Sequence, residues 1–179
     1  MMRMRQAHPS ATGFTLIELL VVIAVIAIFA TIAVPALQET IKNNRVTSHN
    51  NEIVSLINFA KSEAIRRNGR VAVEFFSGAG WEAQVVVDDE DGGPVVDSVP
   101  GCPDGALRCA AETGTALDAA LTLTFNSRGY LDPFAMVSLY VEHANCTSQR
   151  QRRRIEVLPT GQVNSCGVGC GLGLPGGCP

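Results

Sequence analysis

The chain has 179 residues, of which 46% are hydrophobic and 17% are charged. This length fits one modest globular domain with an additional segment and excludes a multidomain architecture. The formal net charge of −3 at pH 7 gives the chain as a whole no electrostatic attraction to nucleic acid.

The N-terminal region begins with a short basic leader that contains Arg3 and Arg5, followed by the hexapeptide GFTLIE at residues 13–18. An almost unbroken apolar run then covers residues 14–37. As a helix this run would be about 36 Å long, enough to cross a hydrocarbon core of about 30 Å. The two leader arginines would stay in the cytoplasm, and the remainder of the chain would be translocated.

Glu18 is the one charged residue of the apolar run. A carboxylate at the centre of a spanning helix costs roughly 2.5–3.5 kcal/mol, and less toward an end, so such a residue usually has a charged partner. Cleavage after Gly13 would create that partner, the new amine of Phe14. The alternatives are a secretory signal peptide, with Leu19–Ala30 as its apolar region, and an ordinary membrane anchor. An acidic residue directly before the apolar region argues against the signal peptide.

This arrangement resembles the N-terminus of type IV pilins and of the pseudopilins of type II secretion. The resemblance implies that a prepilin peptidase cuts after Gly13 and methylates the amine of Phe14. It also implies that Glu18 pairs with the N-terminal amine of a neighbouring subunit, and that Pro35 marks a bend or a locally melted turn of the helix. Filament assembly would therefore depend on Glu18 and Pro35.

The helix is predicted to continue past the membrane to about Asn68, because the residues after Leu37 are polar enough for water. An apolar stripe with helical spacing follows within residues 38–68. The stripe comprises Ile53, Leu56, Ile57, Ala60, Ala64 and Ile65. Asn68 and Gly69 are a plausible stop signal.

After the helix the period of the apolar residues changes to that of strands. Predicted strands cover residues 71–76, 81–87, 121–125, 136–142 and 155–158, and a last short strand starts within 162–164. Residues 88–120 are rich in Gly, Pro, Asp and Ala and are predicted to form a long surface loop. The predicted fold class is α+β, with one long N-terminal helix packed on an antiparallel sheet.

Several segments narrow the resemblance to the FimT and FimU minor pilins and the minor pseudopilin GspH. They are residues 43–45, 60–67, 125–129 and 154–161. The resemblance implies a structural and assembly-priming subunit at or near the tip of a pilus. Its alternatives are a minor pseudopilin of a type II secretion system and a pilus-displayed subunit that binds DNA.

The expected organisation has five parts. They are a cleaved leader (1–13), a transmembrane and filament-core helix (14–37), its amphipathic continuation (38–68), a periplasmic sheet domain (69–165) and a tail rich in glycine and cysteine (166–179). The expected partners are the prepilin peptidase, other pilins or pseudopilins and the inner membrane. The expected location is the bacterial inner membrane, crossed once, with the N-terminus in the cytoplasm.

All six cysteines lie outside the predicted helix. An even number in the exported part of a chain predicts disulfides formed in an oxidising periplasm. The candidates are Cys102, Cys109, Cys146, Cys166, Cys170 and Cys178. Six cysteines allow 15 pairings, and the turn between Cys102 and Cys109 favours a bond between these two. The alternative is a zinc site of His143 with the four later cysteines, although these lack paired Cys-x2-Cys spacing.

Residues 150–154 contain four arginines, whose planar guanidinium groups suit phosphate recognition. The candidate DNA contacts are Arg150, Arg152 and Arg153. Arg152 and Arg154 would share one face of a strand, and the alternative role is a charged strand edge that resists pairing. DNA-binding relatives have Gly-Arg-x-Arg where this chain has Gly-Gln-Val-Asn at 161–164, a departure that weakens the DNA hypothesis.

Two further patterns argue against a catalytic or metal-dependent protein. The acidic residues 88–91 could offer oxygens to calcium, but the EF-hand spacing is absent and a solvated loop is expected. The nucleophile, phosphate-loop and metalloprotease motifs GxSxG, GxxxxGK and HExxH are also absent. We therefore expect no enzyme activity, no cofactor and no metal.

Overall fold

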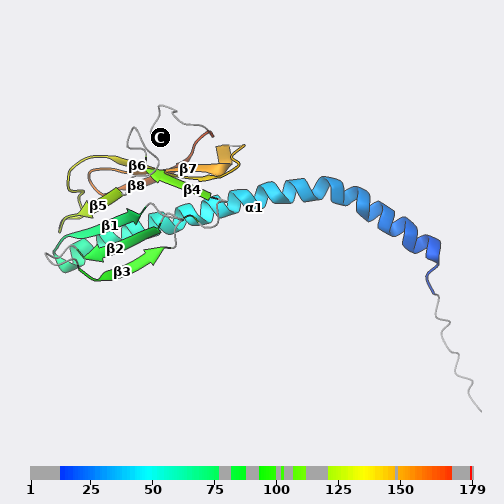
Figure 1. Ribbon diagram of the computed structural model, residues 1–179, viewed down its shortest axis with the longest axis horizontal. Helices are drawn as coiled ribbons and strands as arrows, with labels where there is room; N and C mark the ends of the chain where they lie inside the picture. The colour runs from blue at the N-terminus through cyan, green and yellow to red at the C-terminus, as the bar shows by residue number, and fades with distance from the viewer. Residues whose placement is uncertain are drawn as a thin grey trace, which may run out of the picture. The chain divides into compact units, whose positions relative to one another are not determined.

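The computed structural model describes residues 13–76, 82–87, 93–99, 102, 107–111, 121–147, 149–170 and 178. The elements of the described chain are one long helix, eight strands and the short 3-10 helix η2 (Gln149–Gln151) (Figure 1). The chain forms two compact units, Met1–Thr40 and Ile41–Pro179.

The long helix α1 (Leu16–Arg67) begins at a threonine cap. Thr15 Oγ1 accepts a hydrogen bond from Glu18 N at 3.2 Å, which satisfies one of the amides that a helix start leaves unpaired. Glu18 therefore lies in the first turn, where the positive end of the helix dipole favours a carboxylate.

The end of α1 is a Schellman motif. Asn68 adopts a positive φ of 50°, its N donates to Ile65 O at 3.2 Å, and Gly69 N donates to Ala64 O at 3.1 Å. These two bonds satisfy carbonyls of the last turn. The predicted limits of the helix, Phe14 and Asn68, are confirmed to within two residues.

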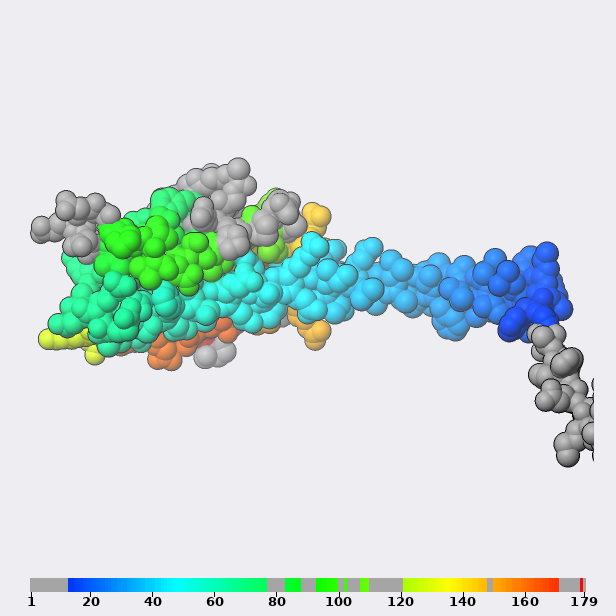
Figure 2. All heavy atoms as spheres, turned by 90° about the horizontal axis from the view of Figure 1, so that it is seen from below, coloured from blue at the N-terminus to red at the C-terminus, as the bar shows by residue number. Residues whose placement is uncertain are grey.

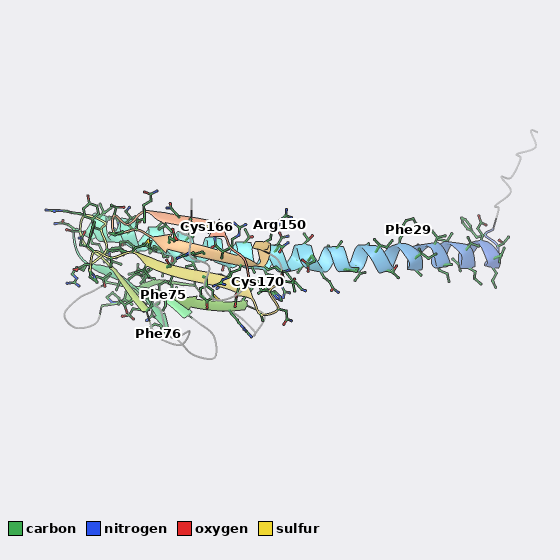
Figure 3. The ribbon with its side chains drawn as sticks, turned by 90° about the horizontal axis from the view of Figure 1, so that it is seen from above. Phe29, Phe75, Phe76, Arg150, Cys166 and Cys170 are labelled. Atoms are coloured by element: carbon green, nitrogen blue, oxygen red, sulfur yellow. A yellow bond between two sulfur atoms is a disulfide. The ribbon has the colours of Figure 1, made fainter. Side chains whose placement is uncertain are left out.

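The unit Met1–Thr40 contains the N-terminal half of α1, whose side chains are all exposed from Leu16 onward. Large apolar side chains project from this half of the helix on every side. One of them is Phe29, which is 67% exposed (Figure 3). By length and composition α1 is apolar enough to cross a membrane. A helix that is apolar on all sides needs an apolar surrounding, either lipid or other helices.

The unit Ile41–Pro179 contains two antiparallel sheets. The first has the order β3-β2-β1-β5 and the second has the order β4-β6-β7-β8. The strands are β1 (Val71–Phe76), β2 (Glu82–Val87), β3 (Val95–Val99), β4 (Leu107–Ala111), β5 (Leu121–Phe125), β6 (Val137–His143), β7 (Arg152–Val157) and β8 (Val163–Gly167). Within this unit the sheets lie beside the C-terminal half of α1 (Figure 1), and Figure 2 shows the green residues of β3 over that part of the helix.

The core of this unit lies between α1 and both sheets. From the helix, Ile53, Leu56, Ile57, Ala60 and Ala64 are at most 2% exposed, which confirms five residues of the predicted stripe. The prediction for the sixth, Ile65, was wrong because it is 50% exposed. Twelve residues after Ile53, Ile65 is rotated by about 120° from it around the helix axis and leaves the buried face. The sheets contribute Val73, Phe75, Phe125, Leu139, Ile155 and Val157.

The α+β class and the long helix on antiparallel strands are confirmed, but three details of the prediction were wrong. The strands form two sheets rather than one. Parts of the predicted loop 88–120 form β3 and β4. The strand β7 begins at Arg152, three residues before the predicted start, because the arginines themselves pair with β6 and β8.

Candidate functional site

The segment before α1 leaves the bond between Gly13 and Phe14 accessible. Residues 13–15 are outside the helix, and Phe14 is 86% exposed. A Cβ placed on Gly13 would meet no atom within 4 Å. A peptidase therefore has room to bind this bond, which lies shortly before Glu18.

Within residues 16–40 two threonine hydroxyls are satisfied by the helix itself. Thr31 Oγ1 donates to Ile28 O at 2.7 Å, and Thr40 Oγ1 donates to Ala36 O at 3.1 Å. Such local bonds remove the cost of placing a hydroxyl in an apolar surrounding. Pro35 lies inside the helix and provides no N–H for the usual bond to the carbonyl four residues earlier. Glu18, the one charged residue of the apolar run 14–37, is thus the side chain of that run that calls for an external partner.

In the domain, Lys61 connects α1 to the two turns that contain Gly129 and Gly161. The sequence suggested no role for this lysine. Lys61 Nζ donates to Gly161 O at 2.9 Å. The turn before it is closed by Gly161 N, which donates to Leu158 O at 2.7 Å. The other turn is closed by Gly129 N, which donates to Asn126 O at 2.8 Å. The Lys61 side chain lies beside both glycines, since a Cβ on Gly129 would be 3.1 Å and a Cβ on Gly161 would be 3.2 Å from its carbon atoms. The segments 125–129 and 154–161, far apart in sequence, therefore meet at this lysine.

Both turns require glycine. Gly129 and Gly161 have positive φ angles of 77° and 72°. A Cβ on Gly161 would lie 2.1 Å from Gly129 O, whereas a Cβ on Gly129 would first meet the end of the Ile65 side chain, at 2.9 Å. The sequence signal for this contact was the pair of glycine turns together with a lysine on the amphipathic helix.

Near the end of α1 a buried carboxylate binds two arginines. Glu63, 6% exposed, accepts hydrogen bonds from Arg66 at 2.6 and 2.8 Å and from Arg67 at 2.8 Å. The hydrogen bonds from Arg66 and then Arg67 lower the pKa of Glu63 from 4.5 to about 2. This cluster stabilises the last turns of the helix. The Glu63 carboxylate also neutralises part of the positive charge of Arg66 and Arg67.

The arginine cluster is distributed over both faces of the second sheet. Arg150 is exposed on η2, and Arg153 is partly buried on the same face as Ile155, which is fully buried. Arg152 is 5% exposed, and its guanidinium carbon lies 4.3 Å from the centroid of the Tyr140 ring. The three predicted DNA contacts therefore share no single exposed face.

The outer face of this sheet is an ionic layer. Arg152 Nε lies 3.7 Å from Glu142 Oε2, and Arg154 Nε lies 3.2 Å from Glu156 Oε1. As predicted, Arg152 and Arg154 lie on one face, but there they bind neighbouring side chains of the sheet. The pair of Arg152 and Glu142 links β7 to β6 at directly opposite positions and so supports their register, whereas Arg154 and Glu156 both lie on β7. Each of these charges would be costly to bury without its partner.

Three disulfides use all six cysteines: Cys102–Cys109, Cys146–Cys170 and Cys166–Cys178. The first is the pair that the turn between its cysteines favoured. Cys166 lies on β8 and Cys170 follows this strand (Figure 3). Cys178 N donates to Glu156 Oε2 at 3.0 Å, which fixes this cysteine against β7.

The alternative zinc set is not formed, because its four cysteines are joined in pairs and His143 Nδ1 accepts a hydrogen bond from Asn145 N at 3.1 Å. The acidic residues 88–91, the candidate calcium ligands, lie outside the described residues. No structural feature of the described part therefore supports either predicted alternative.

The methylation-type N-terminus, the long helix and the antiparallel domain together define a subunit of the type IV pilin class. Residues 9–34 match the family model described as "Prokaryotic N-terminal methylation motif". Residues 49–161, more than half of the chain, match the model described as "Type II transport protein GspH". The chain belongs to the GspH family, and it is a minor pilin or pseudopilin.

Solved structures are similar to this fold at low sequence identity. The type IV minor pilin FimU of Pseudomonas aeruginosa is 15% identical with a TM-score of 0.55, over 68% of this chain and 87% of FimU. The minor pseudopilin EpsH from the type 2 secretion system of Vibrio cholerae is 12% identical with a TM-score of 0.53, over 68% of this chain and 96% of EpsH. No curated protein sequence matches the chain. The family and fold are those of structural subunits.

Proposed function

We propose that this protein is a FimT/FimU-like minor pilin that helps to prime assembly and lies at or near the tip of a pilus. The observation that carries the proposal is the exposed apolar half of α1 with one carboxylate, Glu18, in its first turn. An exposed apolar helix of this length is stable in a bilayer before assembly and among other helices of the same kind after it.

The proposed route begins with insertion into the inner membrane, with Arg3 and Arg5 on the cytoplasmic side and the sheet domain in the periplasm. The prepilin peptidase then removes residues 1–13 and methylates Phe14. The accessible bond after Gly13 and the match to the methylation motif support this processing.

Assembly follows from charge pairing. Glu18 is the fourth residue after Phe14, which corresponds to a helical rise of about 6 Å. A subunit displaced by about one helical turn would therefore bring its Phe14 amine beside the Glu18 carboxylate of its neighbour. In an apolar filament core the attraction between these two charges would be far stronger than in water. The pair would therefore select the axial position of the incoming subunit relative to its neighbour.

The alternative is a GspH-type minor pseudopilin of a type II secretion system, which the match to the GspH model favours. The two proposals differ in the machine and the neighbouring subunits, and the genes beside this one would distinguish them. DNA contact by Arg150, Arg152 and Arg153 stays a prediction, and the pairing of Arg152 with Glu142 and Tyr140 gives it no support.

The test is the variant Glu18→Ala, with Glu39→Ala as the control for loss of a carboxylate outside the apolar run. We expect Glu18→Ala to insert normally into the membrane. Its amount in sheared filaments should fall at least about tenfold, the effect of losing about 1.4 kcal/mol. Normal incorporation of Glu18→Ala, measured against the membrane fraction, would remove the pairing role.

Intact mass of the protein from its native membrane tests the processing separately. The expected mass begins at Phe14 and includes one methyl group and three disulfides. A chain cut after Glu18 or left uncut would contradict the pilin route.

A further inference from the structure

The buried disulfide Cys102–Cys109 has a histidine beside it. A ring nitrogen of His49 and the two sulfur atoms lie within 4.8 Å of one another. All three residues are at most 9% exposed. His49 comes from α1 and Cys109 from β4, and Cys102 precedes Cys109 by seven residues, so the fold brings an imidazole to a pair of cysteines that lie much later in the chain.

A carboxylate orients the imidazole of His49. His49 Nδ1 lies 3.2 Å from Glu52 Oε2, one helical turn further along α1. Since an ionised carboxylate can only accept, this contact places a proton on Nδ1, so that in the neutral imidazole the lone pair is on Nε2. A carboxylate bound to one ring nitrogen is the usual arrangement behind a metal-binding histidine, where it fixes the tautomer and the ring orientation.

We propose that Cys102, Cys109 and His49 bind a zinc ion when the disulfide is open. The two thiols each lose one proton, and their thiolates and the imidazole Nε2 form three bonds to Zn²⁺, with water as the fourth ligand. Tetrahedral zinc with Zn–S distances of about 2.3 Å separates two sulfurs by about 3.8 Å. The Cα atoms of the two cysteines are 6.0 Å apart, so opening the S–S bond and turning the side chains brings the sulfurs to this separation without moving the strand.

The ligand types select the metal. Two thiolates and an imidazole are soft and borderline ligands that favour zinc over magnesium or calcium, which bind oxygen. Among the described residues, no such group forms around either of the other two disulfides.

The metal-bound and disulfide states exclude each other. Forming the disulfide removes two electrons and two protons from the thiols, and a disulfide of a thiol oxidase accepts both electrons and both protons and becomes a dithiol. Zinc bound first would keep both sulfurs as thiolates and protect them from mispairing, and oxidation would release the ion. The site is therefore a property of the reduced chain, independent of the machine in which the subunit works.

The test uses the full-length protein in detergent, treated with a phosphine reductant without oxygen and titrated with Co²⁺ and then Zn²⁺. We expect one cobalt ion per chain, thiolate-to-cobalt charge-transfer absorption, and loss of that absorption on adding zinc. The double variant Cys102→Ser/Cys109→Ser should lose the absorption, and His49→Gln should weaken binding at least tenfold. The matched control Cys146→Ser/Cys170→Ser should keep both.

Absence of charge transfer in the reduced wild-type protein would overturn the proposal, as would unchanged binding in either the double variant or His49→Gln. A second measurement needs no variant. Zinc should protect Cys102 and Cys109 of the reduced wild-type chain from alkylation, mapped by mass spectrometry, while the other four cysteines react. Equal reaction of all six would also overturn it.

Discussion

Replacing Gly161 by alanine tests whether the close approach of the two glycine turns stabilises the domain. Alanine at a φ of 72° costs about 1–2 kcal/mol for the left-handed conformation alone. Its Cβ would lie 2.1 Å from Gly129 O, so the two backbones must separate by more than 1 Å. That shift weakens the hydrogen bond from Lys61, worth about 0.5–1.5 kcal/mol or more for a charged donor. We expect a total loss of about 2–4 kcal/mol.

Gly129→Ala and Gly69→Ala are the matched controls. Gly129 shares the positive φ, but its Cβ would meet the flexible end of Ile65, so we expect only about 1–2 kcal/mol. The nearest atom to a Cβ on Gly69 lies at 3.8 Å, and a change near zero is expected. Urea unfolding of the full chain in detergent, followed by circular dichroism, measures all three. Equal losses for Gly129→Ala and Gly161→Ala would refute the argument from backbone contact.

Three further predictions concern charge, covalent bonds and packing. Because the pKa of folded Glu63 lies at about 2, below its ordinary 4.5, the carboxylate stabilises the fold above pH 4.5 and this contribution is lost as the pH falls toward 2. Glu63→Gln should remove that part of the pH dependence of urea unfolding, and an unchanged acid limb would contradict it. Loop-closure entropy predicts that removal of the Cys146–Cys170 disulfide, whose cysteines are 24 residues apart, costs about 3.5 kcal/mol. Removal of Cys102–Cys109, with a separation of 7, should cost about 2.5 kcal/mol. A lower melting temperature for the variant without Cys102–Cys109 than for the variant without Cys146–Cys170 would argue against this entropic account. Leu139→Ala in the fully buried core should cost about 2–5 kcal/mol in the same unfolding assay, and a cost below 1 would mean that the site is not packed as described.

Prediction from the sequence succeeded where one periodic pattern ran over many residues. The apolar stripe of α1, the cap at Asn68 and the alternation in β1 each follow from local rules. Each was confirmed apart from Ile65 at the end of the stripe and Ala72 in β1, which is buried although both of its neighbours are buried as well. In β1 the alternation buries Phe75 and leaves Phe76 41% exposed (Figure 3). The hexapeptide at 13–18 indicated the class of protein through its resemblance to the N-terminus of pilins. The cost of a carboxylate inside an apolar run predicts that Glu18 has a charged partner.

Prediction failed where a strand depends on its neighbour. In β3 (Val95–Val99) apolar and polar residues do not alternate clearly. This strand forms because it pairs with β2 at the edge of the first sheet. Four arginines within five residues indicated a solvent-exposed segment, and Arg152 was therefore expected at the surface. Its cross-strand contacts with Tyr140 and Glu142 instead compensate the energetic cost of burying its charge. The contact of Lys61 with Gly161 spans 100 residues: the helix and the turn each have a local signal, but no local pattern pairs them.

The connectivity of the two later disulfides constrains the order in which the protein can mature. Cys166 lies between Cys146 and Cys170 in sequence, and its own partner, Cys178, comes after both. The two covalent loops therefore interleave. Because synthesis proceeds from the N-terminus, Cys146 can meet Cys166 before its own partner, Cys170, is available, and Cys166 must wait for Cys178. Both disulfides of the second sheet can therefore be in place only when Cys178 is available, and any Cys146–Cys166 bond made earlier must first be exchanged.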